Sequence, residues 1–197
     1  MKIVGVGAGP RMLTERAIEV VKTARRVYGS ARALKLADEY IRGERIILEK
    51  YDMQIEDDAC ILSTGDPMLS GLGKKAPSNA EIIPGISSLQ LACARLKVDT
   101  TALNVISIHG RQQRESKQKL HRSLRLKQDL FILTDPGFDV SHICSHLDVL
   151  GYDGEVIVLE DLGYATEKVS FGRVASPPER QSTLFCLIVR NLTKKNH

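Results

Sequence analysis

The sequence predicts an α/β protein with two lobes, the first built on a near-parallel sheet and the second on a mixed sheet. Three observations support this fold class. Short apolar runs alternate with helical patterns from Ile3 to Leu159, as in chains of strands and crossover helices. Turns rich in glycine and serine follow several runs, a feature of sheets whose carboxyl edge binds small ligands. The last two apolar runs are separated only by polar residues and Pro177-Pro178, which predicts that these strands are antiparallel.

Length and composition exclude several classes of protein. A chain of 197 residues buries a good core, and 43% hydrophobic and 26% charged residues are ordinary globular proportions. A formal net charge of +4 is too small to indicate a nucleic-acid-binding protein. No apolar run approaches the roughly 18 residues of a membrane span. The strand pattern begins directly after Met1, so we expect no signal peptide and a cytoplasmic location.

The first lobe, residues 1–103, is predicted to hold five strands and four helices. Thr14 is the predicted N-cap of the first helix, whose apolar face contains Ala17, Val20 and Val21. About ten residues separate the third and fourth strands, too few for a helical crossover, so one of the pair is expected at an edge or antiparallel. The strands are expected at 3–6, 26–28, 45–48, 59–63 and 81–83, and the later helices at 31–41, 69–75 and 87–96.

The second lobe, residues 104–197, contains a basic segment and the terminal strands. Residues 111–127 carry seven Lys and Arg residues against the single acid Glu115, and we interpret them as a solvated helix face. Gly151 is expected to end a helix over 139–150. The strands are expected at 104–108, 130–134, 155–159, 168–171 and 184–189.

The cysteine and histidine positions favour neither a disulfide framework nor a metal site. The four cysteines are far apart and form no CxxC pair, so we predict four reduced core thiols, at Cys60, Cys93, Cys144 and Cys186. His142 and His146 have a spacing that suits a shared metal, but a solvated helix face is the more common origin of such a pair. No Ser-His-Asp order, Walker loop or HExxH segment is present, and we predict no protein-bound metal.

Three turns of the first lobe are candidate ligand-binding loops. The run Gly5-Val6-Gly7-Ala8-Gly9-Pro10 lacks the GxGxxG register, and no acid ends the second strand, which argues against a dinucleotide site. It forms either a tight turn or a close backbone approach to a ligand. In Thr64-Gly65-Asp66-Pro67, Asp66 either caps the next helix or hydrogen-bonds a ligand's ribose or amine. In Pro84-Gly85-Ile86-Ser87-Ser88, a serine either caps a helix or lies beside N–H groups that face a polar ligand.

Two strand ends of the second lobe carry further candidates. His109-Gly110-Arg111 follows a strand directly and is expected to point into a cleft, where arginine suits bidentate binding of carboxylates. Glu160-Asp161-Leu162-Gly163-Tyr164 follows another strand. Its paired acids act either as a general base or as the polar residues of a turn.

Taken in order, these segments resemble the tetrapyrrole methylase family, whose members transfer a methyl group from S-adenosylmethionine. The resemblance spans nearly the whole chain and includes Leu13-Thr14 and Leu133-Thr134-Asp135. The His109-Gly110-Arg111 strand end, and Leu162-Gly163-Tyr164 followed by Glu167, resemble one branch more closely. That branch methylates C5 of cobalt-precorrin-7, or of the metal-free precorrin, in cobalamin biosynthesis.

The resemblance implies a two-lobed tetrapyrrole methylase fold, a homodimer, and S-adenosyl-L-methionine folded between the lobes. Arg111 and Arg114, beside His109, would bind the carboxylates of the tetrapyrrole substrate. Asp66, Asp135 and Glu160 are candidates for the catalytic base by position alone. The implied cofactor contacts are Gly9, Thr64, Gly65, Asp66, Leu69, Ser87, Ser88, Leu133, Thr134 and Leu162.

The chain departs from the family pattern near the first two loops. Ala8 stands where the family usually has proline, the connections around 64–67 are short, and Met68-Leu69-Ser70 lacks the usual aromatic residue. We expect no second methyltransferase domain of the kind that some relatives carry, and we therefore expect a separate protein to supply C15 methylation and decarboxylation. Two rival hypotheses are a methylase of the same superfamily acting on ribosomal RNA or modified elongation factor (diphthine type), and a non-enzymatic module that binds nucleic acid through the basic segment.

Replacing Arg111 by alanine should raise the dissociation constant of the tetrapyrrole substrate, because a cation that pairs with its carboxylates is lost. The affinity for S-adenosylhomocysteine should stay unchanged. Isothermal titration measures both constants, and unchanged substrate binding would refute this role of Arg111.

Overall fold

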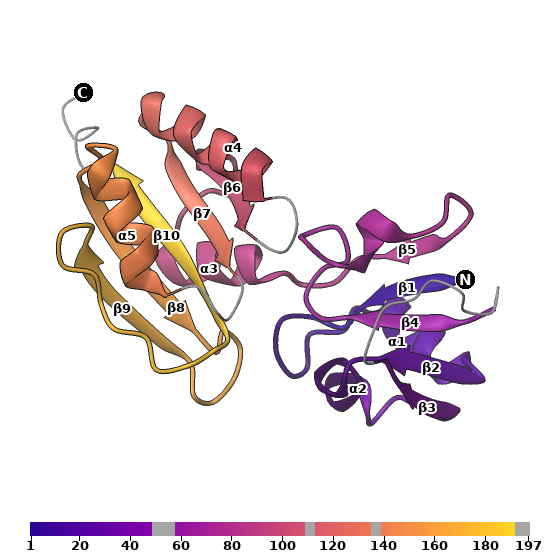
Figure 1. Cartoon of the computed structure of the whole chain (residues 1–197). Coiled ribbons are helices and arrows are strands. Elements are labelled where there is room, and N and C mark those ends of the chain that lie inside the picture. Colours follow the sequence, from indigo (N-terminus) through magenta and orange to yellow (C-terminus); the bar gives the residue numbers. More distant parts are fainter. Residues whose placement is uncertain (49–57, 109–112, 135–138, 192–197) are drawn as a thin grey trace. The chain divides into compact units, whose positions relative to one another are not determined.

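The computed structural model describes residues 1–48, 58–108, 113–134 and 139–191, with the backbone alone of 113–117. The chain divides into two compact units, Met1–Leu91 and Ala92–His197, each with its own sheet (Figure 1). The domain division at residues 103 and 104 stays a prediction. No described helix combines the length and apolar character needed to traverse a bilayer.

The sheet of the first unit has five parallel strands in the order β3-β2-β4-β1-β5. This confirms the near-parallel sheet predicted for the first lobe. The third strand lies at an edge, as one of the two expectations had it, and it runs parallel to its neighbour, so the antiparallel alternative is wrong. The strands are β1 (Lys2–Gly5), β2 (Arg26–Gly29), β3 (Glu44–Ile47), β4 (Cys60–Ser63) and β5 (Glu81–Ile83).

Helices α1 (Glu15–Thr23) and α2 (Ala31–Ala37) pack against one face of this sheet. The hydroxyl of Thr14 accepts a hydrogen bond from the N–H of Ala17 at 3.2 Å, which confirms the predicted N-cap. The apolar core between these two helices and the sheet comprises Val4, Val6, Ala17, Val20, Val21, Val27, Ala33, Leu34, Ala37, Ile41, Cys60, Leu62 and Ile83.

The predicted helix over 69–75 is reduced to the 3-10 turn η1 (Leu72–Lys75). Ser70 has a φ of 56°, and Gly71 is extended, so no helix can run through them. The turn packs Leu72 against Ile3, Tyr28 and Ile61 on the face of the sheet opposite α1 and α2.

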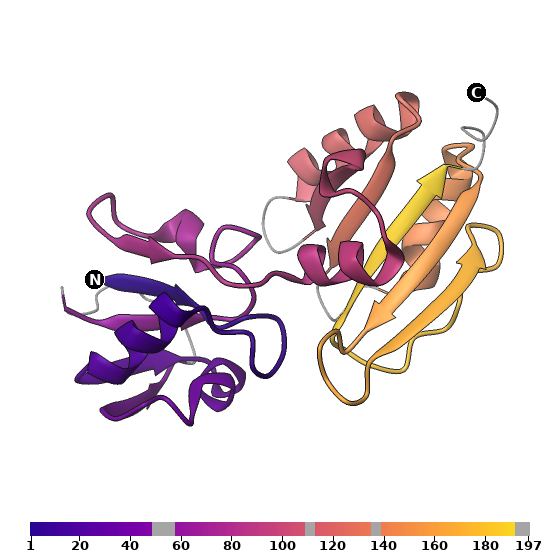
Figure 2. The same ribbon diagram turned by 180° about the vertical axis from the view of Figure 1, so that it is seen from behind.

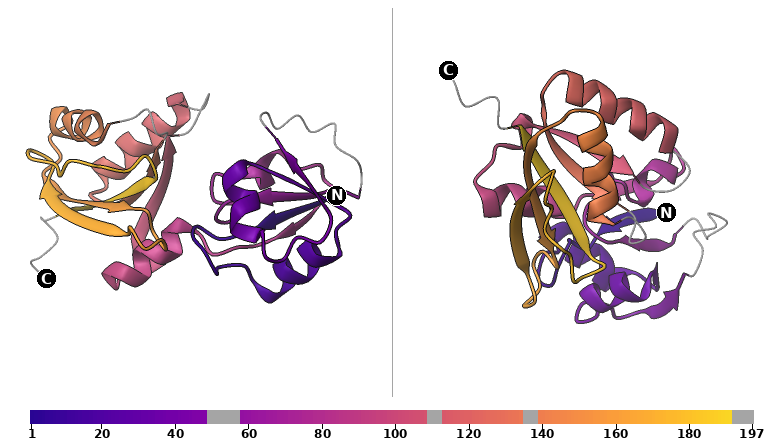
Figure 3. Two further views of the ribbon diagram at one scale, coloured as in Figure 1. Left: turned by 90° about the horizontal axis from the view of Figure 1, so that it is seen from below. Right: turned by 60° about the vertical axis from the view of Figure 1, so that its left-hand side comes forward.

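The second unit contains a mixed five-stranded sheet in the order β6-β7-β10-β8-β9, as predicted in kind. Strands β6 and β7 are parallel, whereas β10 is antiparallel to both β7 and β8. The C-terminal strand β10, drawn in yellow, lies inside the sheet between β7 and β8 (Figure 3). The strands are β6 (Leu103–Ile108), β7 (Asp129–Thr134), β8 (Gly154–Glu160), β9 (Lys168–Arg173) and β10 (Phe185–Asn191).

The two terminal strands are not antiparallel to each other, so that prediction is wrong. Each is antiparallel to β8, one on either side, and they therefore run in the same direction. Burial explains the order. The first five residues of β10 are all buried, which suits a central strand, whereas β9 is only partly buried and its Phe171 is 59% exposed.

Helices α4 (Gln113–Arg125) and α5 (Val140–Val149) cover one face of the second sheet, and their core includes Leu120, Leu124, Ile143 and Leu147. Helix α3 (Ser88–Leu96), whose residues from Ala92 belong to the second unit, lies over the other face (Figure 2). The 3-10 turn η2 (Thr100–Ala102) follows α3.

The basic segment and the cysteines are placed as the sequence predicts. From Gln118 onward, the Lys and Arg side chains of α4 are exposed, which confirms a solvated helix face for the described side chains. Gly151, at φ 68°, follows the end of α5. All four cysteines are buried and free. Burial raises the pKa of the Cys60 thiol to about 12 and that of the Cys144 thiol to about 11, so both are protonated at neutral pH.

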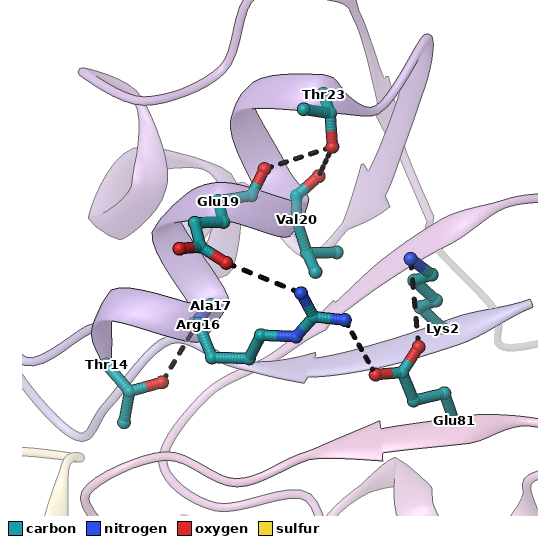
Figure 4. Close-up of polar contacts among 8 residues, drawn as sticks. All are labelled: Lys2, Thr14, Arg16, Ala17, Glu19, Val20, Thr23 and Glu81. Atoms are coloured by element: carbon teal, nitrogen blue, oxygen red, sulfur yellow. Dashed lines mark hydrogen bonds and ion pairs between the residues drawn. The ribbon is translucent and has the colours of Figure 1, made fainter.

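An ionic network joins α1 to the edge strand β5 (Figure 4). Arg16 Nη2 donates to Glu81 Oε1 at 3.2 Å, and Lys2 Nζ lies 3.7 Å from Glu81 Oε2. The hydrogen bond from Arg16 holds the pKa of Glu81 below its ordinary value of 4.5. A carboxylate with a lowered folded-state pKa stabilises the protein above its unfolded pKa, and the contribution disappears as the pH falls through the folded value.

Replacing Glu81 by glutamine should therefore lower the free energy of unfolding slightly at pH 7, and the difference from wild type should shrink below pH 4.5. Added salt should also reduce it, because the three side chains are exposed to solvent. Urea unfolding followed by circular dichroism checks both effects. A difference that is independent of pH would contradict the assignment.

Candidate functional site

Three loops meet at the carboxyl edge of the first sheet. They follow β4, β1 and β5, which are adjacent and parallel, so their carboxyl ends share one edge. The backbones of Gly7 and Gly65 exchange two hydrogen bonds, of 3.2 and 2.8 Å, and the N–H of Ala8 donates to the carbonyl of Ile86 at 2.9 Å. Residues 5–9, 64–67 and 84–87 thus form one connected surface, which we call the loop edge.

Two glycines allow the loops of the loop edge to approach one another. A Cβ on Gly85 would lie 2.4 Å from the carbonyl oxygen of Gly65, and a Cβ on Gly5 would lie 2.5 Å from the nitrogen of Gly85. Gly65 differs, because a Cβ there would meet no heavy atom within 4 Å, although its φ of 70° still favours glycine. Close packing of backbone against backbone therefore accounts for Gly5 and Gly85, and Gly65 marks the open side of the loop edge.

The carboxylate of Asp66 joins two of these loops. Its Oδ1 accepts a hydrogen bond from the N–H of Met68 at 2.7 Å, and its Oδ2 accepts one from the N–H of Gly85 at 3.1 Å. The first bond closes a turn within the loop. It is not the predicted helix cap, because η1 begins only at Leu72 and its N-cap, Gly71, receives no side-chain hydrogen bond. The second spans 19 residues and fixes the loop after β5 to the loop after β4. Leu69 completes the turn, with its N–H donating to the carbonyl of Asp66 at 3.2 Å.

Ser87 caps helix α3 in a reciprocal arrangement with Gln90. The N–H of Gln90 donates to Ser87 Oγ at 3.2 Å, and the N–H of Ser87 donates to Gln90 Oε1 at 2.8 Å. This is a capping box, and it supports the capping interpretation of the serine. Ser87 is 5% exposed, whereas Ser88, the first helical residue, is only partly buried.

Arg32 also contributes to the loop edge, although it was not predicted from the sequence. Its Nη2 donates to the carbonyl of Ala8 at 2.8 Å and so supports the loop after β1 from the first turn of α2. The only indication in the sequence is its place just after the second strand, since a residue there starts at the same edge of a parallel sheet. Gly9, in the same loop, is buried.

In the second unit, Leu133 and Thr134 end strand β7 with their side chains on opposite faces of the sheet. Thr134 shares the face of Ile132, which is covered by α4 and α5. It is 5% exposed, and its hydroxyl has no hydrogen-bond partner among the described residues. Two cofactor contacts predicted from neighbouring positions therefore cannot both use their side chains toward the same space.

The acidic pair after β8 fastens two chain segments together. Glu160 Oε1 accepts hydrogen bonds from the N–H groups of Gln181 and Ser182, at 2.5 and 2.6 Å. Asp161 accepts from the hydroxyls of Ser182 and Thr166, at 2.6 and 2.9 Å. These contacts favour the interpretation of the pair as polar residues of a turn. Glu160 Oε2 is buried and has no partner within the described part of the chain.

Leu162 lies in the turn after β8 and is 5% exposed, so its side chain is buried. His109, Arg111 and Asp135 lie outside the described residues, as does the side chain of Arg114, whose backbone is in α4. Among the residues that the structure describes, no three His, Cys, Asp or Glu side chains are grouped to hold a metal ion.

Comparisons with known proteins agree with this geometry. Residues 2–178 match the family model described as Tetrapyrrole (Corrin/Porphyrin) Methylases. The chain is 34% identical over 194 residues to the protein named probable cobalt-precorrin-7 C(5)-methyltransferase of Methanocaldococcus jannaschii, covering 85% of this chain and 86% of that protein. It is 30% identical to the decarboxylating precorrin-6Y C(5,15)-methyltransferase of Sinorhizobium sp, covering 86% of this chain and 44% of that protein.

Solved structures show the same fold. The precorrin-6Y methylase of Archaeoglobus fulgidus superposes with a TM-score of 0.74 and 31% identity, over 97% of both chains. Uroporphyrin-III C-methyl transferase from Thermus thermophilus, solved with S-adenyl homocysteine, has a TM-score of 0.73 over 98% of both chains, at 20% identity. Since the family model covers most of the sequence, and close relatives align over most of their own length, the chain belongs to the tetrapyrrole methylase family.

Proposed function

We propose that this chain transfers the methyl group of S-adenosyl-L-methionine to C5 of cobalt-precorrin-7, or of the metal-free precorrin, in cobalamin biosynthesis. The observation that carries the proposal is the similarity to the Methanocaldococcus jannaschii protein, which extends over 85% of this chain and 86% of that one. The Archaeoglobus fulgidus methylase, which matches over 97% of both chains, supports the same substrate class.

The loop edge fits a small polar cofactor such as S-adenosyl-L-methionine. The space beside Gly65 is open, and the surrounding loops are held by their own hydrogen bonds, so they need no ligand to keep their shape. The implied contacts of the first unit, Gly9, Thr64, Gly65, Asp66, Leu69, Ser87 and Ser88, lie in these loops or in the turns that continue them. In the second unit, the unpartnered hydroxyl of Thr134 is a polar group at a predicted contact.

When bound, S-adenosylmethionine supplies a methyl group already activated by its sulfonium centre. The work left to the protein is to bind and orient, and orientation alone can account for a large part of a rate enhancement. Asp66 serves this purpose by fixing two loops of the loop edge. Arg111 and Arg114, with His109, would hold the carboxylates of the tetrapyrrole.

The proton acceptor is proposed to be one of Asp66, Asp135 and Glu160. Both oxygens of Asp66 already accept a backbone hydrogen bond. Glu160 is bonded through Oε1, while its Oε2 keeps an acceptor position that no described residue uses. This difference favours Glu160 over Asp66.

We further propose, on the family resemblance, that the protein acts as a cytoplasmic homodimer. We also propose that a separate protein carries out C15 methylation and decarboxylation. The name of the Sinorhizobium relative joins the C5 and C15 reactions, and the match with this chain covers 44% of that protein.

The function is tested in two steps. Isothermal titration with S-adenosylhomocysteine should show saturable binding, and incubation with S-adenosylmethionine and the corrinoid precursor should give a singly methylated product, identified as C5-methylated by NMR. Failure to bind S-adenosylhomocysteine would refute the methylase function. Binding without methylation of the precursor, together with methylation of ribosomal RNA or of elongation factor, would assign a different substrate.

Replacing Asp66 by alanine should lower the free energy of unfolding by about 2 kcal/mol and weaken S-adenosylhomocysteine binding, since both backbone hydrogen bonds are lost. Asp66→Asn keeps one acceptor oxygen, so it should lose about half as much stability. Urea unfolding and isothermal titration measure the two effects.

Asp99→Ala is the matched control. Asp99 accepts a hydrogen bond from the N–H two residues ahead at 2.8 Å, as Asp66 does at 2.7 Å, but it does so as the N-cap of η2 in the second unit. It should lower stability without changing the affinity for S-adenosylhomocysteine. Equal losses of affinity in the two alanine variants would contradict a specific role for Asp66.

A further inference from the structure

The turn between β8 and β9 has an unusual backbone that must be held in place. Asp161 has a φ of 47° and Gly163 a φ of 84°, so the residue before Leu162 and the residue after it are both left-handed. A left-handed conformation is unfavourable for a residue with a Cβ, such as Asp161, unless its surroundings enforce it. Two short turns follow one another, with Tyr164 N–H donating to the Asp161 carbonyl at 2.9 Å and Glu167 N–H to the Tyr164 carbonyl at 3.0 Å.

Glu167 closes this turn. Its Oε2 accepts a hydrogen bond from the N–H of Gly163 at 2.7 Å, which ties the end of the turn to its middle. The beginning of the turn is tied separately, because Asp161 bonds the hydroxyls of Ser182 and Thr166. Backbone positions 162–164 therefore lie between two anchored carboxylates, and Glu167 bonds them directly at Gly163 N–H.

Arg95, in the last turn of α3, fixes the position of Glu167. Its Nε donates to Glu167 Oε1 and its Nη2 donates to Oε2 at 3.2 Å, so the guanidinium meets the carboxylate with two hydrogen bonds. This bidentate geometry defines the orientation of a carboxylate, which a single contact does not. The hydrogen bond from Arg95 also lowers the pKa of Glu167, so Glu167 is ionised at neutral pH.

This ion pair is partly open to solvent, which limits its contribution to folding. The side chain of Arg95 is 46% exposed and that of Glu167 is 18% exposed, and ion pairs open to solvent contribute little to folding. What the pair does determine is the place of Gly163 N–H, and with it the backbone of Leu162, at the carboxyl end of β8. The carboxyl end of β7, with Thr134, lies at the same edge of the sheet, since both strands are antiparallel to β10.

We propose that Glu167, oriented by Arg95, is a positioning residue that holds the backbone of residues 162–164 in the conformation that binds the cofactor. The inference rests on the proposed function, because it takes Leu162 as a cofactor contact. It predicts that breaking the pair weakens cofactor binding more than it weakens the fold. Glu167 itself need touch neither cofactor nor substrate.

The test compares Glu167→Ala, Glu167→Gln and Arg95→Met with the wild-type protein. Glu167→Ala should raise the dissociation constant of S-adenosylhomocysteine about tenfold or more, because both contacts are lost. Glu167→Gln keeps an oxygen that can accept from Gly163 N–H, so the rise should be clearly smaller. In steady-state assays the KM for S-adenosylmethionine should rise while kcat and the KM for the corrinoid change little.

Two further measurements separate positioning from general stability. Arg95→Met combined with Glu167→Ala should bind no more weakly than Glu167→Ala alone, since the two residues act through one contact. Arg173→Met is the matched control, because it breaks another exposed pair of the same unit, with Asp153 at 2.8 and 2.9 Å. It should leave the dissociation constant unchanged while its thermal unfolding shifts by a similar amount.

The outcomes distinguish this inference from the function on which it rests. Wild-type protein that fails to bind S-adenosylhomocysteine would overturn both. Equal affinity of wild type and Glu167→Ala would overturn the inference alone. If Glu167→Ala does not fold, Glu167→Gln and Arg95→Met decide, and affinities in both that match the wild-type value would overturn it as well.

Discussion

The candidate site of the first unit depends on the contact between three backbone loops at the edge of a parallel sheet. Gly5 and Gly85 lie so close to their neighbours that a single added carbon would overlap a backbone atom, at 2.5 and 2.4 Å. The strands β4, β1 and β5 bring the loops to one edge, and the two missing side chains let them touch. Once they touch, the hydrogen bonds between Gly7 and Gly65 and from Gly85 to Asp66 can form. The loop edge is thus a shape made mainly of main chain, with few side chains in its contacts.

Carboxylates at the strand ends support this main-chain surface instead of forming a catalytic cluster. Asp66 joins two loops, Glu160 and Asp161 fasten the segment before β10, and Glu167 closes the turn after β8. Each carboxylate accepts hydrogen bonds from backbone N–H groups or hydroxyls, and these bonds make the loop that carries it more rigid. Such an arrangement suits a reaction whose reactivity comes with the cofactor, because the protein then contributes mainly geometry.

Local patterns in the sequence were enough to predict most strands, the N-cap at Thr14, the buried cysteines and the positions of the loops that meet at the loop edge. They could not predict contacts between distant residues. The bond from Gly85 to Asp66 spans 19 positions and the pair of Arg95 with Glu167 spans 72, and neither leaves a periodic pattern in the chain. The prediction that β9 and β10 are antiparallel to each other was wrong for the same reason. The absence of a helix between two strands does not show whether a third strand lies between them in the sheet. The prediction of a helix over 69–75 was wrong for a local reason, because the positive φ of Ser70 is incompatible with an α-helix.

The central position of β10 also has a consequence for folding of the chain during translation. Residues 185–191 form the middle of the second sheet, hydrogen-bonded on both sides, although they follow all other described strands in the sequence. On the ribosome, the edges of β7 and β8 that pair with β10 stay unpaired until this segment leaves the exit tunnel. The first sheet is complete by residue 83 and can fold while translation continues. A nascent chain stalled between these points would expose the apolar edges that chaperones recognise.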